Sequence, residues 1–387
     1  MKKYDVAVCG GGFAGISAAL AAAREGKSVV LFEKEYILGG LGTAGLIAVY
    51  LPLCDGLGHQ VSFGIAEELL RLSISYGAEA MYPENWLDGI GEKSEKDKRF
   101  EVQYNPQLFA ILAEKLLLDN KVDIFYGSYV VDVELENDRI KTLFVQNKSG
   151  RVPFEVCSVV DATGDCDIAY LSDVPTETFK QGNLLAAWYY FTDKTGYCLQ
   201  PLGAADVPEE ERVEKGETPL INRRFSGLDG KEISEMVCLS HTQILKNWLN
   251  KREQDKSTAI STIATIPQIR MTRKIVGEYE LSHLEEQTFF EDSIGMVSNW
   301  KKRGPIYEVP FRTLYNNCLK NLITAGRSVS TNETLWDVMR VIPCCAVTGQ
   351  AAGTAAAMTS DFSSLDVSKL QKKLQENGVV LHKKDIF

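Results

Sequence analysis

The chain has 387 residues, which is enough to bury a large core and to form about two domains. Its formal net charge is −10, and since binding to nucleic-acid phosphates needs a basic face, no nucleic-acid partner is expected. No apolar run reaches the length of a membrane span, so no membrane insertion is expected. The nine scattered cysteines include no CxxC pair, which favours free thiols and a cytoplasmic location.

Residues 5–33 have the pattern of strand, glycine-rich turn, helix and second strand that binds a dinucleotide. The turn places Gly10, Gly12 and Gly15 at GxGxxG spacing, and the segment after it is rich in good helix formers. Gly10 permits the tight turn, Gly12 lets a pyrophosphate approach the backbone, and Gly15 lets helix and strand pack closely. The helix N-terminus offers N–H groups to phosphates. Glu33, after the second strand, can accept hydrogen bonds from a ribose diol.

Further helices and strands follow this unit. A glycine-rich loop at 39–45 comes first, and hydrophobic spacing then predicts helices over 64–76 and 106–118. The pattern of apolar residues predicts strands over the ranges 122–126, 129–135, 139–146 and 152–160. The last of these strands runs directly into a turn at 161–165.

Residues from about 171 to 310 change character. They contain clustered aromatic residues and predicted helices near 232–253 and 257–283. A strand at 322–327 then runs into a glycine turn, and a helix of small residues is predicted to begin at Thr348.

This order of elements predicts an α/β fold with two domains. A Rossmann-like dinucleotide-binding domain is expected to be discontinuous, with residues 1–170 and 310–387 contributing to it. An α+β substrate or cap domain, residues 171–309, is expected to be inserted into it.

Three separated motifs stand together in this chain. They are the glycine turn with Glu33, the sequence Asp161-Ala-Thr-Gly-Asp165, and Ala325-Gly-Arg327 followed by the segment 340–353. Together they resemble the FAD-dependent oxidoreductase family that is related to the fumarate reductase and succinate dehydrogenase flavoproteins. The resemblance covers nearly the whole chain and is weakest in 190–255, within the region where substrate specificity is expected. It implies that the discontinuous domain binds FAD in an extended form.

The resemblance also implies a role in FAD binding for individual residues. Contacts near the pyrophosphate are implied for Gly10, Gly12, Phe13, Ala14, Gly15, Ala162, Thr163 and Gly164, and contacts with adenosine for Glu33, Lys34 and the backbone of Val130. Gly40, Thr43, Gly326 and Arg327 would lie along the rest of the cofactor, the last two near the ribityl chain. Gly349 and Gln350 would stand at a helix N-terminus facing the isoalloxazine, where the helix dipole stabilises the negative charge of reduced flavin. The alternative for 349–353 is a helix start that small residues allow to pack closely.

Arginines are the expected substrate ligands, because they bind an acidic or carbonyl group through fixed, bidentate hydrogen bonds. Arg270 and Arg273 would share a face if their segment is helical, and Arg340 lies in the C-terminal motif. We expect Arg273 and Arg340 to face the flavin and bind substrate, with structural ion pairs as the alternative. Tyr307 and Glu308 are candidate proton donors, with surface packing as the alternative.

The favoured function is FAD-dependent hydride transfer to or from a small organic substrate, an acid or a carbonyl compound. Two alternatives stay open. One is an electron-transfer flavoprotein subunit or flavin-binding module that acts with a redox partner protein, and the other is an NAD-dependent dehydrogenase that uses the glycine turn alone. No cysteine occurs between Gly40 and Cys54, which argues against dithiol chemistry of the glutathione reductase type. No His/Cys cluster has metal-ligand spacing, so no metal is expected.

Overall fold

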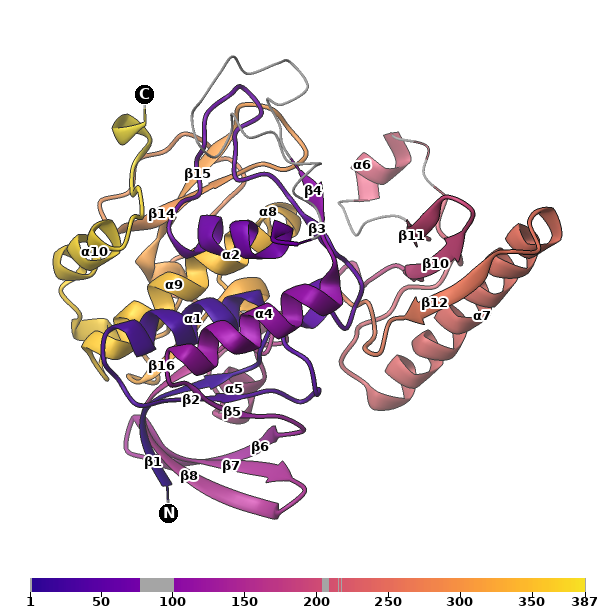
Figure 1. Ribbon diagram of the computed structural model, residues 1–387. Coiled ribbons are helices and arrows are strands. Elements are labelled where there is room, and N and C mark those ends of the chain that lie inside the picture. Colours follow the sequence, from indigo (N-terminus) through magenta and orange to yellow (C-terminus); the bar gives the residue numbers. More distant parts are fainter. Residues whose placement is uncertain (1, 77–100, 204–208, 215, 217, 387) are drawn as a thin grey trace.

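The computed structural model describes residues 2–76, 101–203, 209–214, 216 and 218–386. A seven-stranded sheet has the order β5-β2-β1-β8-β7-β6, with β16 also paired to β8 (Figure 1). Strands β5, β2, β1, β8 and β16 pair in parallel, and β7 and β6 extend the sheet as an antiparallel meander. The bounds are β1 Lys2–Cys9, β2 Val29–Phe32, β5 Asp123–Phe125, β6 Tyr129–Glu136, β7 Arg139–Asn147, β8 Gly150–Asp161 and β16 Leu322–Thr324. The α/β fold and every strand expected in this sheet are confirmed, with shifts of a few residues at their ends.

Both faces of the parallel part of the sheet are covered, as this kind of sheet requires. Val6 and Val8 of β1 pack in one core with α1 and α9, while Ala7 and Cys9 pack in a second core with α5 on the opposite face. The helices around the sheet are α1 Phe13–Arg24, α2 Ile65–Ile74, α4 Pro106–Asp119, α5 Asp167–Leu171, α8 Glu333–Met339, α9 Ile342–Met358 and α10 Val367–Glu376. Because successive side chains of a strand point to opposite faces of the sheet, β1 contributes residues to both cores.

Helices α1 and α9 lie side by side because small residues let their backbones approach (Figure 1). A Cβ on Gly349 would lie 2.2 Å from the carbonyl oxygen of Ala14, and one on Gly353 would lie 2.1 Å from that of Ala18. The expected start of α9 at Thr348 is wrong, since the helix begins at Ile342. The alternative for 349–353 is therefore confirmed in its close packing, but this packing lies inside the helix and not at its start.

A second group of elements lies beside the large sheet (Figure 1). A three-stranded antiparallel sheet, ordered β11-β10-β12, has one face covered by α7, where Tyr189, Phe191, Ile244 and Trp248 pack together. The bounds are β10 Tyr189–Asp193, β11 Gly196–Gln200, β12 Ala259–Ile263, α6 Glu209–Glu214 and α7 Gly230–Gln254. The expected helix near 232–253 is confirmed.

The expected helix over 257–283 is wrong. This segment forms β12 and then β13 (Arg273–Ile275), which pairs with β9 (Thr176–Thr178). The residues between them, 264–272, form neither a helix nor a strand. The three-residue spacing of Arg270 and Arg273 therefore does not place both on one helical face.

The hairpin of β14 (Ser293–Ser298) and β15 (Ile306–Pro310) packs into the larger core with α9. These residues fall inside the expected cap domain, so the second group of elements is smaller than that expectation. Strands β3 (Val49–Tyr50) and β4 (Val102–Gln103) form a separate short pair. Short 3-10 helices lie at Gly40–Gly42, Phe311–Thr313, Gly326–Ser328, Phe362–Ser364 and Lys383–Asp385.

Within the described ranges, no single helix is long and apolar enough to cross a membrane. Helices α8 and α9 reach that length only when taken together, and they are bent by 87° at the break between them.

Candidate active site

The glycine turn between β1 and α1 is shaped by close backbone contacts. Gly10 has a φ of +102°, and a Cβ on it would lie 2.4 Å from the carbonyl oxygen of Ala162. A Cβ on Gly15 would lie 1.8 Å from the carbonyl oxygen of Gly10, so both positions require glycine. Gly12 differs, because a Cβ there would meet no described atom within 4 Å. As the N-cap of α1, Gly12 leaves the first-turn N–H groups facing open space, where an anion can bind them.

Glu33, which follows β2, is held by backbone N–H groups. Its Oε2 accepts a hydrogen bond from Gly11 N at 2.6 Å, and its Oε1 accepts one from Glu35 N at 2.8 Å. Burial raises the pKa of this carboxyl. The carboxylate fixes the glycine turn against β2 and keeps further lone pairs for a ribose diol, because each carboxylate oxygen accepts more than one hydrogen bond.

Asp161 at the end of β8 organises the second turn. Its Oδ2 accepts from Ile168 N at 2.8 Å and Ala169 N at 3.1 Å, and its Oδ1 accepts from the hydroxyl of Thr163 at 2.7 Å. The side chain is fully buried, and burial raises its pKa. These bonds fold the turn back so that it lies against Gly10.

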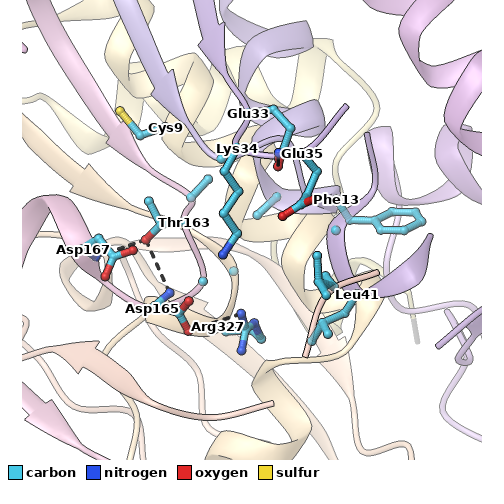
Figure 2. Close-up of a pocket in the computed structure, with 18 of the residues that line it drawn as sticks. Cys9, Phe13, Glu33, Lys34, Glu35, Leu41, Thr163, Asp165, Asp167 and Arg327 are labelled. Atoms are coloured by element: carbon cyan, nitrogen blue, oxygen red, sulfur yellow. Dashed lines mark hydrogen bonds and ion pairs between the residues drawn. The ribbon is translucent and has the colours of Figure 1, made fainter. Parts of the chain in front are cut away.

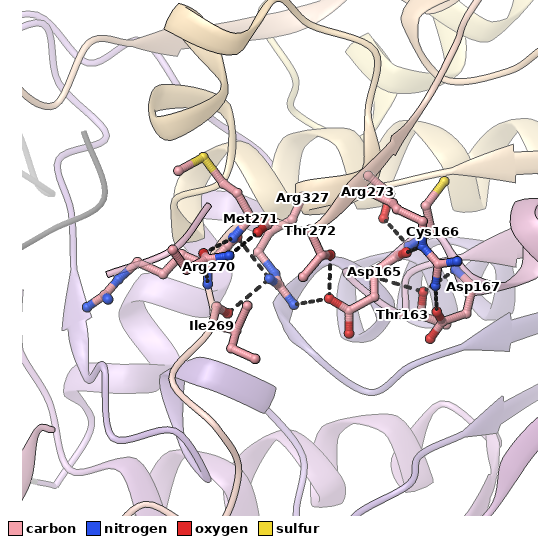
Figure 3. Close-up of polar contacts among 12 residues, drawn as sticks. Thr163, Asp165, Cys166, Asp167, Ile269, Arg270, Met271, Thr272, Arg273 and Arg327 are labelled. Atoms are coloured by element: carbon pink, nitrogen blue, oxygen red, sulfur yellow. Dashed lines mark hydrogen bonds and ion pairs between the residues drawn. The ribbon is translucent and has the colours of Figure 1, made fainter. Parts of the chain in front are cut away.

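Arg327, in the third turn, joins that turn to the turn after β8 (Figure 3). Its Nη1 donates to the carbonyl oxygens of Ile269, at 3.1 Å, and Arg270, at 2.8 Å. Its Nη2 lies 3.5 Å from Oδ1 of Asp165, which also accepts from the hydroxyl of Thr272 at 2.7 Å. One guanidinium therefore ties the C-terminal turn to the turn after β8 and to the segment before β13.

Hydrogen bonds with α8 and α9 also fix the turn that carries Arg327. Gly326 N donates to Oγ1 of Thr348 on α9 at 3.0 Å, and Nε1 of Trp336 donates to the carbonyl oxygen of Arg327 at 2.7 Å. Thr348 and Trp336 are both buried. Helices α8 and α9 thus fix the position of the turn relative to α1.

A cavity of about 240 Å³ runs between these turns (Figure 2). The expected cofactor residues that line it are Gly10, Gly12, Phe13, Ala14, Glu33, Lys34, Gly40, Val130, Ala162, Thr163, Gly164, Gly326 and Arg327. The expected residues that lie outside its lining are Gly15, Thr43, Gly349 and Gln350. The lining thus brings together all three separated motifs of the sequence.

Residues around the start of α9 lie at the cavity, where Gly349 and Gln350 were expected. Gln350 lies deep in the helix, where its Oε1 accepts from Ile65 N at 2.8 Å. The placement of these two residues at a helix N-terminus is therefore wrong. Arg340, Ile342 and Cys345, around the first turn of α9, line the cavity instead.

Arg273 lies behind the second turn, outside the cavity lining. Its Nε donates to the carbonyl oxygen of Asp165 at 3.0 Å, and its Nη2 donates to Oδ1 of Asp167 at 2.6 Å (Figure 3). Its guanidinium also lies 4.1 Å from the ring centroid of Tyr170. This position suits a structural ion pair, in contrast to the expected substrate contact, whereas Arg340 is at the cavity.

The expected proton donors also lie away from the cavity lining. The hydroxyl of Tyr307 donates to the carbonyl oxygen of His283 at 3.2 Å. Glu308 accepts from Phe290 N at 2.9 Å and pairs with Nδ1 of His382 at 2.9 Å. Both residues are buried, so their contacts show packing in the interior, in contrast to the surface packing of the alternative.

Other lining residues were missed by sequence reasoning. The cap end is lined by Gly227, Ile233, Ile266, Pro267 and Ile269, and the nucleotide end also by Gly39, Leu41, Ser128, Tyr129, Asp165 and Asp167. Asp165 ends the recognised turn and Asp167 follows two residues later, so their position in the sequence is a usable signal. The apolar cap residues gave none, because an apolar residue in a sequence is most often part of a core.

Titratable groups along the cavity have altered acidity. Burial, together with the carboxylates of Asp165 and Asp161, raises the pKa of Asp167 to about 6. Burial raises the pKa of the Cys345 thiol to about 12, although Arg327 and Arg340 act in the opposite direction. Cys345 is therefore a neutral thiol at physiological pH.

The groups that line the cavity can be compared with those that a bound dinucleotide requires. The open space at Gly12, the free first-turn N–H groups of α1 and the carboxylate of Glu33 are the groups that a dinucleotide requires at its pyrophosphate and ribose. The cavity then continues past Arg327 to the first turn of α9. The residues present fit an extended dinucleotide such as FAD.

Comparisons with known proteins agree with this fit. The family model described as FAD dependent oxidoreductase matches residues 5–187 and 210–374. The thioredoxin reductase of Ureaplasma parvum serovar 3 is 31% identical over 79 residues, which are 20% of this chain and 26% of that protein. The chain thus matches only about a quarter of the length of this curated relative.

Solved structures of low sequence identity share parts of the arrangement. A geranylgeranyl bacteriochlorophyll reductase-like protein from Thermoplasma acidophilum has a TM-score of 0.44 at 13% identity, covering 97% of this chain and 82% of that one. The L-alpha-glycerophosphate oxidase of Mycoplasma pneumoniae, solved with FAD bound, has a TM-score of 0.33 at 17% identity, covering 51% and 63%. Because the family match extends over most of the sequence, the chain belongs to the FAD-dependent oxidoreductase family.

Proposed function

We propose that the enzyme moves a hydride between FAD and a small organic acid or carbonyl compound held where the cavity meets α9. The observation that supports this is the composition of the cavity lining. Ile233, Ile266 and Ile269 form apolar walls from the cap side, and Arg340 provides a cation from the α9 side. When bound, FAD supplies the hydride chemistry, so the chain has to bind and orient the substrate and exclude water.

Arg340 is proposed as the residue that binds the substrate. It lies between α8 and α9 and lines the cavity with only part of its side chain exposed. A guanidinium in this setting binds a carboxylate or carbonyl through paired hydrogen bonds, which fix the orientation of the reacting carbon. The resemblance to fumarate reductase flavoproteins further supports a reaction at a carbon–carbon bond beside a carbonyl group.

The first turn of α9 is proposed to stabilise negative charge in the flavin site. Its N-terminal N–H groups lie beside Ile342 and Cys345, both of which line the cavity. The positive end of a helix dipole favours an anion placed there, so it raises the reduction potential of a flavin whose ring approaches it. The neutral thiol of Cys345 adds no opposing charge.

The alternative function is an electron-transfer subunit whose partner protein holds the substrate. The apolar, inward-facing end of the cavity favours the enzyme with its own substrate site. We also propose a cytoplasmic location, which the nine free cysteines support.

The test is anaerobic reduction of the bound flavin by a panel of hydroxy acids, saturated acids and alcohols, followed by flavin absorbance. At least one substrate should bleach the wild-type flavin, and Arg340→Ala should slow that reduction by about a hundredfold. Arg139→Ala is the matched control, because this arginine binds Ser360 and Asp361 far from the cavity lining. Reduction only by a redox protein, and by no small molecule, would favour the alternative.

A further inference from the structure

The cap-side wall of the cavity is a short segment fixed at two points. Thr265 N donates to the carbonyl oxygen of Ala44 at 2.9 Å. Three residues later, Nε2 of Gln268 donates to the carbonyl oxygen of Gly45 at 2.7 Å. Gln268 is buried, and its Oε1 also accepts from Trp188 N at 2.8 Å. Both fixed points lie against the glycine-rich loop of the nucleotide-binding part of the chain.

Ile266 and Pro267, between these fixed points, line two cavities. One is the cavity that takes the cofactor. The other is much smaller, about 10 Å³, and lies against α7, which lines it with apolar Met236, Val237 and Ile244 and with polar Ser240 and His241. The two residues therefore form a wall between the cofactor cavity and the smaller hollow against α7.

We infer that Ile266 determines how long the apolar part of the substrate can be. This inference rests on the proposed function and adds a substrate class: an acid with one carboxylate and an apolar body. Arg340 would hold the carboxylate, and the isoleucine-lined end would take the body. Burying each further methylene strengthens binding about fourfold, until the chain meets the wall.

The choice of Ile266 over its neighbour follows from backbone contacts. The hydrogen bonds that fix the segment belong to Thr265 and Gln268, so truncating the side chain of Ile266 removes wall atoms and keeps both anchors. Replacing Pro267 would also free its φ angle and loosen the segment. Beyond the wall, α7 offers apolar side chains that can accept additional methylenes.

The test is a titration of the flavin-bound enzyme with straight-chain saturated monocarboxylates from butanoate to dodecanoate, with flavin absorbance as the readout. Wild-type affinity should rise with chain length to a maximum and then stop rising. For Ile266→Ala the maximum should move to acids about two carbons longer, because the two cavities then join. Ile263→Ala is the matched control, since Ile263 on β12 lines neither cavity and its variant should keep the wild-type maximum.

The outcomes separate this inference from the proposed function. Arg340→Gln should weaken every acid by about tenfold or more without moving the maximum. If Arg340→Gln weakens binding but Ile266→Ala keeps full flavin content and the wild-type maximum, the role of Ile266 is wrong and the substrate site stands. If no acid changes the wild-type flavin spectrum, or Arg340→Gln binds all acids like wild type, the monocarboxylate site itself is refuted.

Discussion

Gly10 and Gly12 are two residues apart, but Gly10 is closely packed against backbone and Gly12 faces open space. A Cβ at Gly12 would meet no described atom within 4 Å, and its φ of −70° suits any residue. We therefore expect Gly12→Ala to fold normally but to bind FAD at least about tenfold more weakly, because the methyl group fills the space for the pyrophosphate. The measurement is FAD affinity by fluorescence quenching, together with the thermal midpoint of the cofactor-free protein.

Gly10→Ala is the contrasting variant. Its Cβ would lie 2.4 Å from the Ala162 carbonyl oxygen at a φ of +102°, so we expect the cofactor-free protein itself to lose stability. Equal loss of stability in both variants would contradict the distinction between a cofactor-facing glycine and a structural one.

Asp167 gives the site a defined pH dependence. Its pKa in the folded protein is raised to about 6, above the ordinary value of about 4 for an unfolded aspartate. The folded state therefore takes up the proton first, so this group favours folding at low pH and loses that contribution as pH rises through about 6. We expect Asp167→Asn to be more stable than wild type at about pH 7.5, with the difference shrinking near pH 5.

Thermal midpoints of both proteins at the two pH values test this. Asparagine still accepts a hydrogen bond from Arg273, so the substitution isolates the charge. A stability difference that stays constant between the two pH values would show that Asp167 does not titrate in this range.

Arg273 and Arg340 show what a sequence can and cannot say about a side chain. Both are arginines close to recognised motifs, and both were equally plausible as substrate ligands. Which one reaches the cavity depends on the backbone around it. Arg273 begins a strand that turns it toward Asp165 and Asp167, and Arg340 stands just before α9. Contacts between residues far apart in the sequence decide which arginine reaches the cavity. Such contacts cannot be read from the spacing of neighbouring residues.

At the scale of elements, the contact between α1 and α9 leaves no room for a larger side chain at Gly353. A Cβ on Gly353 would lie 2.1 Å from the carbonyl oxygen of Ala18, which is backbone and cannot move aside. We expect Gly353→Ala to lower the free energy of unfolding by about 2–3 kcal/mol, although alanine is the better helix former. Denaturant unfolding measures this.

Gly230→Ala, at the start of α7, is the control for that variant. Its Cβ would meet no described atom within 4 Å, so stability should stay equal or rise slightly. If Gly353→Ala also left stability unchanged, the close approach of the two helices would not be a real constraint on the fold.

The start of α9 shows why element boundaries were harder to predict than elements. The second strand of the unit at 5–33 is confirmed as β2, where four buried apolar residues stand between polar ones. The start of α9 was placed at Thr348 because the small-residue pattern begins there, although Pro343 in the first turn marked the true start. The segment 257–283 was predicted as helix from its spacing, but pairing with β9 and β10 made it strands.

At the scale of the whole molecule, the cofactor should act as a stabilising ligand. The cavity is lined by the N-terminal turn, the turn after β8, the cap segment and the C-terminal turn, so FAD contacts parts that are distant in sequence. At about a hundredfold excess over its dissociation constant, FAD should add about 2.7 kcal/mol, which is roughly 3 °C in the thermal midpoint. Differential scanning fluorimetry of protein with and without added FAD measures the shift.

NAD at the same concentration is the control for that measurement. A larger shift with NAD than with FAD would contradict the cofactor assignment. The protein purified with its cofactor should also be yellow, with absorbance between about 350 and 500 nm, because oxidised flavin absorbs there.

The pairing of β16 with β8 has a consequence for how the enzyme is made in the cell. Residues 322–324 complete the sheet begun near the N-terminus, and α9 covers α1 only after residue 342 has been synthesised. At ribosomal speeds of about 5–20 residues per second, the glycine turn after β1 waits about 15–65 seconds for these partners. During that interval the nascent chain exposes the alanine-rich face of α1, so chaperone binding to ribosome-bound chains should be strongest before α9 emerges.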